Sequence, residues 1–391
     1  MNLNAVVLKK GKEVIFKNKH LWIFSGAIAS YPDLFENGSI QTVVSSNHEV
    51  LGHAYFNRDM SLAGRIVSFG DKDPYDSIKK NIANAMSLRK SFIDEKHTNA
   101  YRLINGEGDF LPGLVVDRYA DYLVLQSYTL GMDGLKDFIV DSLMEIDQFK
   151  AVYEKSSSPS RREEKLKESV TVLKGKDIED LPILENGLQF NVNWRRGQKT
   201  GFFLDQREMR EKVRALSQGR TMLNCFSYTG GFSIYALSGG AKKVDSIDIS
   251  HDAVEKVKNH LEINQFNSTK NLCLKEDVFD FLTNKPLPYD FVILDPPAFA
   301  KKKRDILQAK NGYRALNFLA LSKMPSQSLL LTCSCSYYIH EKDFQELLFQ
   351  AAREANREVK IISKHIQALD HPVSLFHPES DYLKSFLLYI L

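Results

Sequence analysis

The chain has 391 residues, of which 43% are hydrophobic and 26% charged, and its 52 basic and 49 acidic residues leave a formal net charge of +3. This length is too great for one ordinary hydrophobic core, so two or three domains are expected. Because no apolar run is long enough to span a membrane, the N-terminus lacks a signal-peptide pattern, and the four cysteines show no disulfide framework or metal-ligand spacing, we expect a cytoplasmic protein with no membrane partner and no metal ion.

Residues 1–70 contain short apolar runs separated by turns and no long helical period. This pattern predicts a small β-barrel-like domain. Basic residues gather at its start and recur in two later clusters: Lys9, Lys10, Lys12, Lys17 and Lys19, then Arg195, Arg196 and Lys199, then Lys301, Lys302, Lys303 and Arg304. A charge run is most often a solvated face, but three such clusters favour a polyanionic partner such as a nucleic acid.

Residues 73–183 have a different pattern. Ile78, Ile82 and Met86 follow a helical period, short strands come next, and a second helical period covers 135–146. This mixture predicts a small α+β middle domain.

From 184 to 391, strands and helices alternate with short gaps. The strands are almost continuously apolar, which is typical of a parallel sheet covered on both faces. The alternation predicts a doubly wound α/β fold. The last two strands, near 359–366 and 384–391, have no helix between them, so we expect an antiparallel pair at one edge of the sheet.

Small and acidic residues follow the strands of this region. Gly230 lies in a turn after the first strand, and the next three strands end in Asp248, Asp277 and Asp295. Ligands bind at the carboxyl ends of such strands, where an acid after the second strand can bind ribose hydroxyls. Each aspartate alone could be a helix cap. Together they favour a neutral or cationic nucleoside, because they would repel a pyrophosphate.

These residues resemble the class I S-adenosylmethionine-dependent methyltransferases. The resemblance implies a cofactor loop at 224–231 that includes Asn224, Phe226, Tyr228 and Gly230, with Asp248 at the ribose, Asp277 at the adenine edge and Asp295-Pro296-Pro297 at the reaction centre.

Further stretches narrow the resemblance. QKTGFFLDQR at 198–207, TCSCS at 332–336 and DHP at 370–372 are similar to the RlmI-like family of 23S ribosomal RNA cytosine-C5-methyltransferases. That family implies a PUA domain at 1–70, a middle domain at 73–183 and a methyltransferase domain at 184–391. It implies ribosomal RNA as the partner, and a homodimer stays open. Candidate substrate contacts are Lys9, Lys17, Lys199, Phe202 and Pro296.

The cysteines of the TCSCS stretch explain how such an enzyme would work. Carbon 5 of cytosine is a poor nucleophile until a thiolate adds to carbon 6, which requires a reactive, accessible cysteine. The resemblance implies that Cys335 is this nucleophile and that Asp295 binds the exocyclic amine or protonated N3 of cytosine. Cys333 is the alternative nucleophile, while Cys225 and Cys273 lie in apolar strands and are expected to be structural.

Two other functions remain open. The enzyme could methylate a nitrogen of guanine or adenine at Asp295-Pro296-Pro297 without any thiol, although Ala298 departs from the Asp-Pro-Pro-Phe pattern. Alternatively, the chain could be an RNA-binding protein with a degenerate catalytic domain, against which the complete set of strand-end aspartates argues.

Overall fold

The computed structural model describes residues 4–267, 270–300 and 302–391. The described chain divides into two compact units. The N-terminal unit comprises residues up to 184 with 192–204 and 369–380, and the C-terminal unit comprises 185–191, 205–368 and 381–391. The division into three domains at 1–70, 73–183 and 184–391 stays a prediction. Within the described ranges, no helix is long and apolar enough to cross a membrane.

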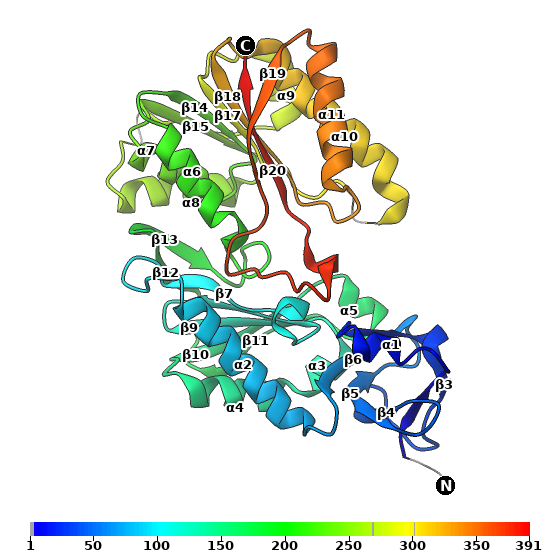
Figure 1. Cartoon of the computed structure of the whole chain (residues 1–391). Helices are drawn as coiled ribbons and strands as arrows, with labels where there is room; N and C mark the ends of the chain where they lie inside the picture. Colours follow the sequence, from blue (N-terminus) through cyan, green and yellow to red (C-terminus); the bar gives the residue numbers. More distant parts are fainter. Residues whose placement is uncertain (1–3, 268–269, 301) are drawn as a thin grey trace. The chain divides into compact units, whose positions relative to one another are not determined.

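The N-terminal unit begins with a curled sheet of six strands (Figure 1). Its order is β2-β6-β5-β4-β1-β3, with antiparallel pairs except between β1 and β4. The apolar side chains inside the curl form a core of their own, which includes Ile23, Phe56 and Ile66. The elements are β1 (Val6–Leu8), α1 (Val14–Lys17), β2 (Trp22–Phe24), η1 (Ser25–Ala27), β3 (Ile28–Ser30), β4 (Ile40–Val44), β5 (Val50–Phe56) and β6 (Leu62–Phe69).

A five-stranded sheet of order β11-β10-β9-β8-β7 follows in the same unit. Ile78 and Ile82 of α2 and Leu143 of α4 pack in its core, as their helical periods predict. The elements are α2 (Pro74–Lys90), β7 (Ala100–Asn105), η2 (Gly106–Asp109), β8 (Leu114–Tyr119), β9 (Tyr122–Ser127), α3 (Leu130–Gly134), α4 (Lys136–Ile146), β10 (Ala151–Ser156), α5 (Ser160–Glu163) and β11 (Ser169–Gly175). A hairpin of β12 (Asp180–Glu185) and β13 (Leu188–Asn193) turns at Asn186 and Gly187, which both have positive φ.

The C-terminal unit contains a seven-stranded sheet of order β16-β15-β14-β17-β18-β20-β19. The first five of these strands run parallel, and β20 runs antiparallel to both β18 and β19. This arrangement confirms the doubly wound α/β fold and the antiparallel pair at the edge. The strands are β14 (Thr221–Cys225), β15 (Lys243–Asp248), β16 (Cys273–Lys275), β17 (Phe291–Leu294), β18 (Ser328–Ser334), β19 (Val359–His365) and β20 (Lys384–Ile390).

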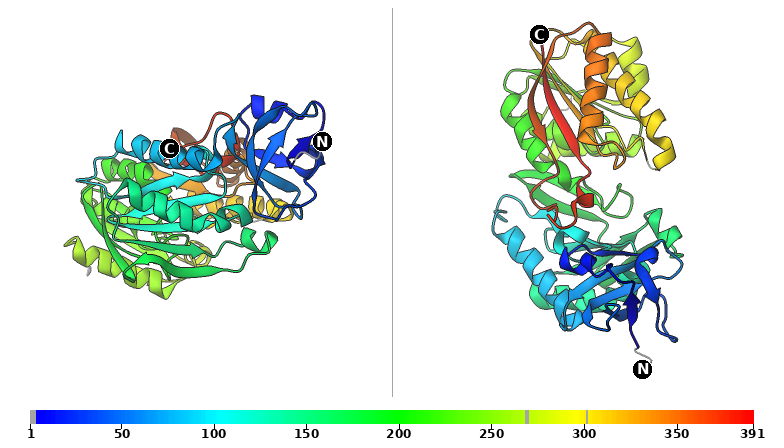
Figure 2. Two further views of the ribbon diagram at one scale, coloured as in Figure 1. Left: turned by 90° about the horizontal axis from the view of Figure 1, so that it is seen from below. Right: turned by 45° about the vertical axis from the view of Figure 1, so that its right-hand side comes forward.

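Helices cover both faces of this sheet (Figures 1 and 2). Helices α6 (Arg207–Leu216) and α7 (Gly231–Ser238) share one apolar core with the sheet, and α9 (Val278–Asn284), α10 (Ile306–Lys323) and α11 (Glu341–Glu354) share the other. Helix α8 (His251–Ile263) packs beside β15 and β16. Strand order reverses between β14 and β17, so the loops at their carboxyl ends form the place where such folds bind ligands.

Candidate active site at the strand ends

The loop between β14 and α7 has a tight, strained backbone. Phe226 and Tyr228 have left-handed φ values of 57° and 47°, and Gly230, the N-cap of α7, has a φ of 81°. A Cβ atom on Gly230 would lie 2.9 Å from the Val257 side chain. Backbone strain of this kind is costly and is concentrated at functional sites. Gly230 is therefore required by both its conformation and its close neighbour.

A buried histidine of α8 forms a hydrogen bond to the backbone of this loop. His260 of α8 donates from Nδ1 to the carbonyl oxygen of Thr229 at 2.7 Å, and its Nε2 accepts the amide of Asn191 at 3.0 Å. These two bonds define the neutral tautomer. Burial disfavours the imidazolium and lowers the pKa of His260 to about 4. The loop is therefore held by a histidine that stays neutral near pH 7.

The predicted ribose-binding acid lies where the sequence places it, at the end of β15. Its two carboxylate oxygens accept the amides of Tyr228 at 2.8 Å and Ser250 at 2.9 Å, so Asp248 also orders the loop. Each carboxylate oxygen has a second lone pair for another donor. Asp277 is the N-cap of α9 and accepts the amide of Asp280 at 3.1 Å, as the helix-cap alternative predicted. Capping does not use all of its acceptor capacity either.

Two buried acceptors at the end of β14 fit a nucleoside-containing cofactor. Within the described part of the chain, Asn224 Oδ1 and Ser227 Oγ have no hydrogen-bond partner, although both residues are buried. Buried polar atoms are nearly always paired in folded proteins. A ligand with hydroxyl or amino donors would pair them. The residues present therefore suit the cofactor that the sequence indicates.

The cysteines near the reaction centre differ in accessibility. Cys335, just after β18, is half-buried, and its Sγ lies 3.8 Å from the carbonyl oxygen of Pro296, which follows Asp295. Cys333 is fully buried, and this burial raises its pKa well above the usual value, with Asp295 raising it further. Burial likewise raises the pKa of Cys225, and raises that of Cys273 to about 11. Of the four, Cys335 combines partial exposure with a position beside the Asp-Pro-Pro stretch.

One charged residue of the site was not predicted. Lys384, the first residue of β20, is buried, and its ammonium donates to the carbonyl oxygens of Ser336 at 2.8 Å and Tyr382 at 2.6 Å. Burial lowers its pKa to about 8, while Asp381 and Cys335 act in the opposite direction. The feature of the sequence that could have indicated this residue is a lysine at the start of a strongly apolar strand.

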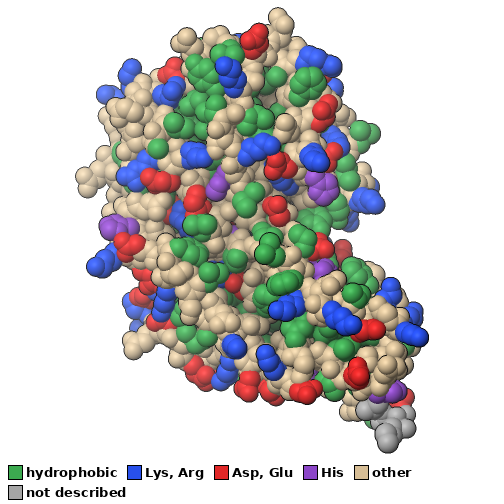
Figure 3. Space-filling model, in the orientation of Figure 1, with side chains coloured by type: hydrophobic (Ala, Val, Ile, Leu, Met, Phe, Trp, Pro, Cys, Tyr) green, Lys and Arg blue, Asp and Glu red, His purple; other side chains and the backbone are tan. Residues whose placement is uncertain are grey.

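The predicted substrate contacts are distributed over both units. Lys9, Lys17 and Lys199 are exposed and Phe202 is buried, all in the N-terminal unit, whereas Pro296 is buried in the C-terminal unit. Lys301 lies outside the described residues. On the face drawn in Figure 3, lysine and arginine side chains are interspersed with acidic ones. The structure therefore leaves the roles of these five candidate contacts as predictions.

Comparison with known proteins identifies the family. Residues 161–375 match the S-adenosylmethionine-dependent methyltransferase family, and residues 6–69 match a PUA-like domain. A structure from Streptococcus mutans assigned as a SAM-dependent methyltransferase is 26% identical over the whole of both chains, with a TM-score of 0.84. A structure of a protein assigned as a methyltransferase and complexed with SAH, also 26% identical over both whole chains, has a TM-score of 0.85.

Relatives with higher identity cover nearly the full chain. A protein of Vibrio parahaemolyticus is 38% identical over 394 residues, 99% of each chain, and one of Aliivibrio fischeri is 37% identical over 388 residues, 98% of each chain. Both are named ribosomal RNA large subunit methyltransferase I. With its PUA-like domain and its methyltransferase fold, the chain therefore belongs to the S-adenosylmethionine-dependent methyltransferase family, and within it to the family of the ribosomal RNA large subunit methyltransferases I.

Proposed function

We propose that the protein methylates carbon 5 of a cytosine in 23S ribosomal RNA, with Cys335 as the nucleophile. The relatives named as ribosomal RNA methyltransferases support the substrate class. The observation that supports this chemistry is the half-buried thiol of Cys335, which lies 3.8 Å from the carbonyl oxygen of Pro296, the middle residue of Asp295-Pro296-Pro297. Cys333, which is fully buried with a raised pKa, is a much poorer nucleophile.

The cofactor would lie along the ends of β14 to β17. Asn224, Phe226, Tyr228 and Gly230 would surround it, with Asp248 at the ribose hydroxyls, Asp277 at the adenine edge and Asp295 near the reacting groups. When bound, S-adenosylmethionine supplies an electrophilic methyl group. The strained loop and the buried unpaired acceptors Asn224 Oδ1 and Ser227 Oγ support this assignment.

The residues of the chain would activate the base in a defined order. The Cys335 thiolate forms a bond to carbon 6, and the electron pair of the ring double bond moves toward carbon 5, which becomes nucleophilic. Asp295 binds the exocyclic amine or the protonated N3, and a protonated N3 neutralises the negative charge that the adding thiolate brings to the ring. After carbon 5 is methylated, a base removes its proton, and the electron pair left behind expels the Cys335 thiolate and restores the ring double bond. The cytosine must be unstacked to reach this position.

RNA that carries 5-fluorocytidine at the target tests this mechanism. Fluorine cannot leave as a proton, so elimination stops and wild-type enzyme stays covalently attached to the RNA. We expect Cys335→Ala to lose both methylation and adduct formation, and the matched variant Cys333→Ala to keep forming the adduct. The reverse pattern would assign the nucleophile to Cys333, and an active wild type that forms no adduct would contradict the covalent mechanism.

Methylation of a purine nitrogen is the second candidate, because Asp295-Pro296-Pro297 could bind an exocyclic amine without any thiol. Under that mechanism both cysteine variants would keep their activity. Mass spectrometry of nucleosides from 23S RNA treated with the enzyme and labelled cofactor distinguishes 5-methylcytidine from the methylated purines. A protein that only binds RNA would yield neither product.

The expected RNA contacts and cellular location follow from the proposed activity on ribosomal RNA. Lys9 and Lys17 in the PUA-like domain, together with Lys199 and Phe202, would contact RNA, and a ribosomal RNA substrate would place the enzyme in the cytoplasm. The four free cysteines suit that reducing compartment.

We also propose that the protein forms a homodimer. Strand β19 forms an edge of its sheet and leaves Ile361 and Ile362 exposed by 42% and 50%. The two exposed isoleucines offer apolar surface for pairing with another chain, although Lys360 and Lys364 of the same strand are charged and exposed. Light scattering on the wild type and on Ile362→Lys would test the homodimer, since the added charge should dissociate it. A monomeric wild type would contradict this proposal.

A further inference from the structure

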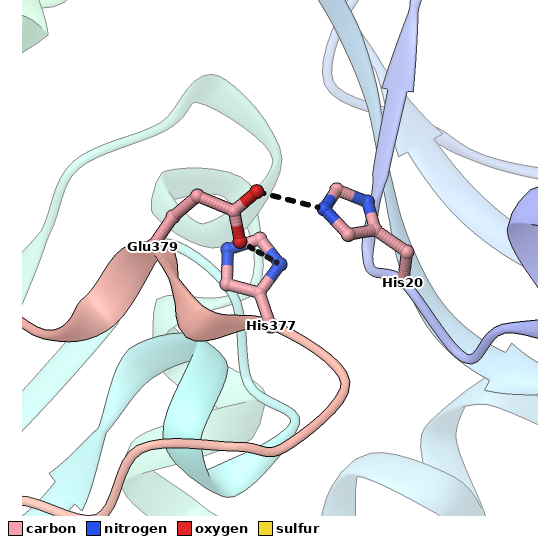
Figure 4. Close-up of side chains that lie close together, drawn as sticks. All are labelled: His20, His377 and Glu379. Atoms are coloured by element: carbon pink, nitrogen blue, oxygen red, sulfur yellow. Dashed lines mark hydrogen bonds and ion pairs between the residues drawn. The ribbon is translucent and has the colours of Figure 1, made fainter.

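Three side chains with metal-binding atoms lie together in the N-terminal unit (Figure 4). His20 precedes β2, while His377 and Glu379 lie at η5 (Pro378–Ser380). Nε2 of His20 lies 3.3 Å from Oε1 of Glu379, and Nδ1 of His377 lies 3.6 Å from Oε2 of Glu379. One ligand atom from each residue can be chosen so that all three lie within 4.8 Å of one another.

His377 is the unusual member of this cluster. Its side chain is only 1% exposed, yet neither ring nitrogen has a hydrogen-bond partner within the described residues. Oε2 of Glu379 is also buried without a hydrogen-bond partner in the described part of the chain. Leaving buried polar atoms unpaired costs free energy, so such atoms require a water, an ion or another ligand. Here they belong to an imidazole and a carboxylate that face each other.

The geometry points to a binding site for a divalent transition-metal ion of the Zn²⁺ class, held by His20, His377 and Glu379. Zinc is bound by histidine nitrogen and carboxylate oxygen at about 2.0–2.2 Å in a tetrahedron, which separates neighbouring ligand atoms by roughly 3.3 Å. The two measured separations, 3.3 and 3.6 Å, involve different oxygens of Glu379, and one ligand atom from each residue lies within 4.8 Å of the other two, so side-chain rotation would bring the three atoms to that value. A water molecule would complete the four ligands.

The surrounding residues hold the cluster in place. The indole of Trp22 packs against His377 with ring centroids 4.4 Å apart, and its Nε1 donates to Glu107 at 3.0 Å. The backbone of His377 is fixed by bonds to Ser374 at 3.0 Å and Ser380 at 3.2 Å. These contacts fix the ring and the backbone of His377, and none of them within the described residues is a hydrogen bond to its imidazole.

Metal binding would replace two hydrogen bonds of His20, the first of which joins its Nε2 to Oε1 of Glu379 at 3.3 Å. Nδ1 of His20 accepts the amide of Trp22 at 3.3 Å, a long bond. With a metal on Nε2, Nδ1 must carry the proton, so this bond is lost. These two long hydrogen bonds are exchanged for metal–ligand bonds and for the pairing of one of the two unpaired ring nitrogens of His377.

The ion would join two segments that are distant in sequence. His20 and Glu379 are 359 positions apart, so the short-range spacing that normally reveals zinc ligands could not indicate this site. A bound ion would fasten the segment 369–380 to the PUA-like domain. The other end of that segment is already anchored, because Asp370 accepts the amide of Arg102 at 2.7 Å.

Zinc titration of the full-length protein tests the proposal. Untagged protein is stripped with a chelator, and Zn²⁺ binding is followed by calorimetry and elemental analysis. We expect a single tight site in the wild type. Glu379→Gln and His377→Gln should each weaken binding by roughly 100-fold or more, since even outer-sphere partners change metal affinity by about 10–100-fold. The wild type should also gain thermal stability on adding Zn²⁺, because the ion binds the folded state.

His97→Gln is the matched control. His97 is exposed and also pairs with a carboxylate, with Nδ1 2.7 Å from Oδ2 of Asp94, and it should retain wild-type affinity. If His377→Gln fails to fold, the more exposed Glu379→Gln still tests the site. Equal Zn²⁺ affinity in the wild type and Glu379→Gln, or no tight binding in the wild type, would overturn the proposal.

A spectroscopic measurement locates the ion without reference to activity. Co²⁺ in the site should quench the fluorescence of Trp22, which contacts His377. Trp22→Phe should remove the quenched component and leave the buried Trp194 as the remaining emitter. Quenching that is unchanged in Trp22→Phe would place the ion elsewhere and overturn the assignment.

Discussion

The ammonium of Lys384 donates a 2.8 Å hydrogen bond to the carbonyl oxygen of Ser336, the residue that follows Cys335. This contact follows from the sheet, because β20 pairs with β18 so that Lys384 lies opposite Ser334. A nearby positive charge favours a thiolate over a thiol. With its pKa lowered to about 8 by burial, Lys384 keeps that charge below about pH 8. We therefore infer that Lys384 is a positioning residue that favours the thiolate form of Cys335.

Replacing this lysine should make Cys335 react only at higher pH. In Lys384→Met, the pH profile for alkylation of Cys335 by iodoacetamide should move upward by about 1 unit, in line with the loss of one nearby opposite charge. Alkylated peptides would be quantified by mass spectrometry. The exposed Lys258, which pairs with Glu255, offers the control Lys258→Met. Identical profiles for wild type and Lys384→Met would show that the lysine is structural only.

The neutral state of His260 should make stability depend on pH. The pKa of His260 is about 4 in the folded protein against an ordinary value of 6.5, so between these values the unfolded state binds the extra proton. The contribution of the neutral His260 to the free energy of unfolding is therefore fully present above pH 6.5. It is lost as the pH falls toward 4, by about 3 kcal/mol in all, because each pKa unit is worth about 1.4 kcal/mol.

Denaturant unfolding at pH 7.5 and pH 4.5 would measure this loss for His260→Gln and the wild type. Glutamine does not titrate, so the variant should lose less stability on acidification than the wild type. The exposed His251 supplies the control His251→Gln, which should behave like the wild type. An equal acid-induced loss in His260→Gln would contradict the role given to this histidine.

Asp248 should contribute to cofactor affinity through the ribose. Asp248→Ala removes acceptors for the hydroxyl groups, so SAH binding measured by calorimetry should weaken by about 1–3 kcal/mol. The variant also frees the amides of Tyr228 and Ser250, and thermal unfolding would record that separate effect. Asp252→Ala, an exposed change in the first turn of α8, is the control. Unchanged affinity in Asp248→Ala would remove this residue from the cofactor site.

Local patterns were sufficient to predict the doubly wound α/β fold of the C-terminal unit. The apolar strands and the absence of a helix between β19 and β20 carry the information for the parallel sheet and its antiparallel edge, because hydrophobic period and connection length decide both features. The order of the strand-end residues in the sequence likewise predicted that Gly230 and Asp248 would follow neighbouring strands.

Interactions between distant segments could not be predicted in this way. Lys384 approaches Ser336 only through the pairing of β18 with β20, and His377 meets His20 across most of the chain. The DHP stretch is a further example, because Asp370 binds the amide of Arg102, while its own carbonyl oxygen accepts a 2.7 Å bond from Arg89. No periodicity or spacing encodes such contacts.

The basic residues of the PUA-like domain should make RNA binding depend on salt. Lys9 and Lys17 are exposed, and neutralising phosphates with such side chains releases counterions. In the double variant Lys9→Gln/Lys17→Gln, the slope of log affinity against log salt should become shallower by about 1.4 for single-stranded RNA, since each lost phosphate contact changes it by about 0.7. Filter binding to a 23S RNA fragment over a range of salt concentrations would measure the slope.

Lys79→Gln, which removes an exposed lysine that pairs with Glu145, should leave the slope unchanged. SAH affinity should be equal in all three proteins, because the substituted lysines lie in the N-terminal unit, whereas the strand ends proposed to bind the cofactor lie in the C-terminal unit. A slope that stays at the wild-type value in the double variant would mean that this cluster is only a solvated face.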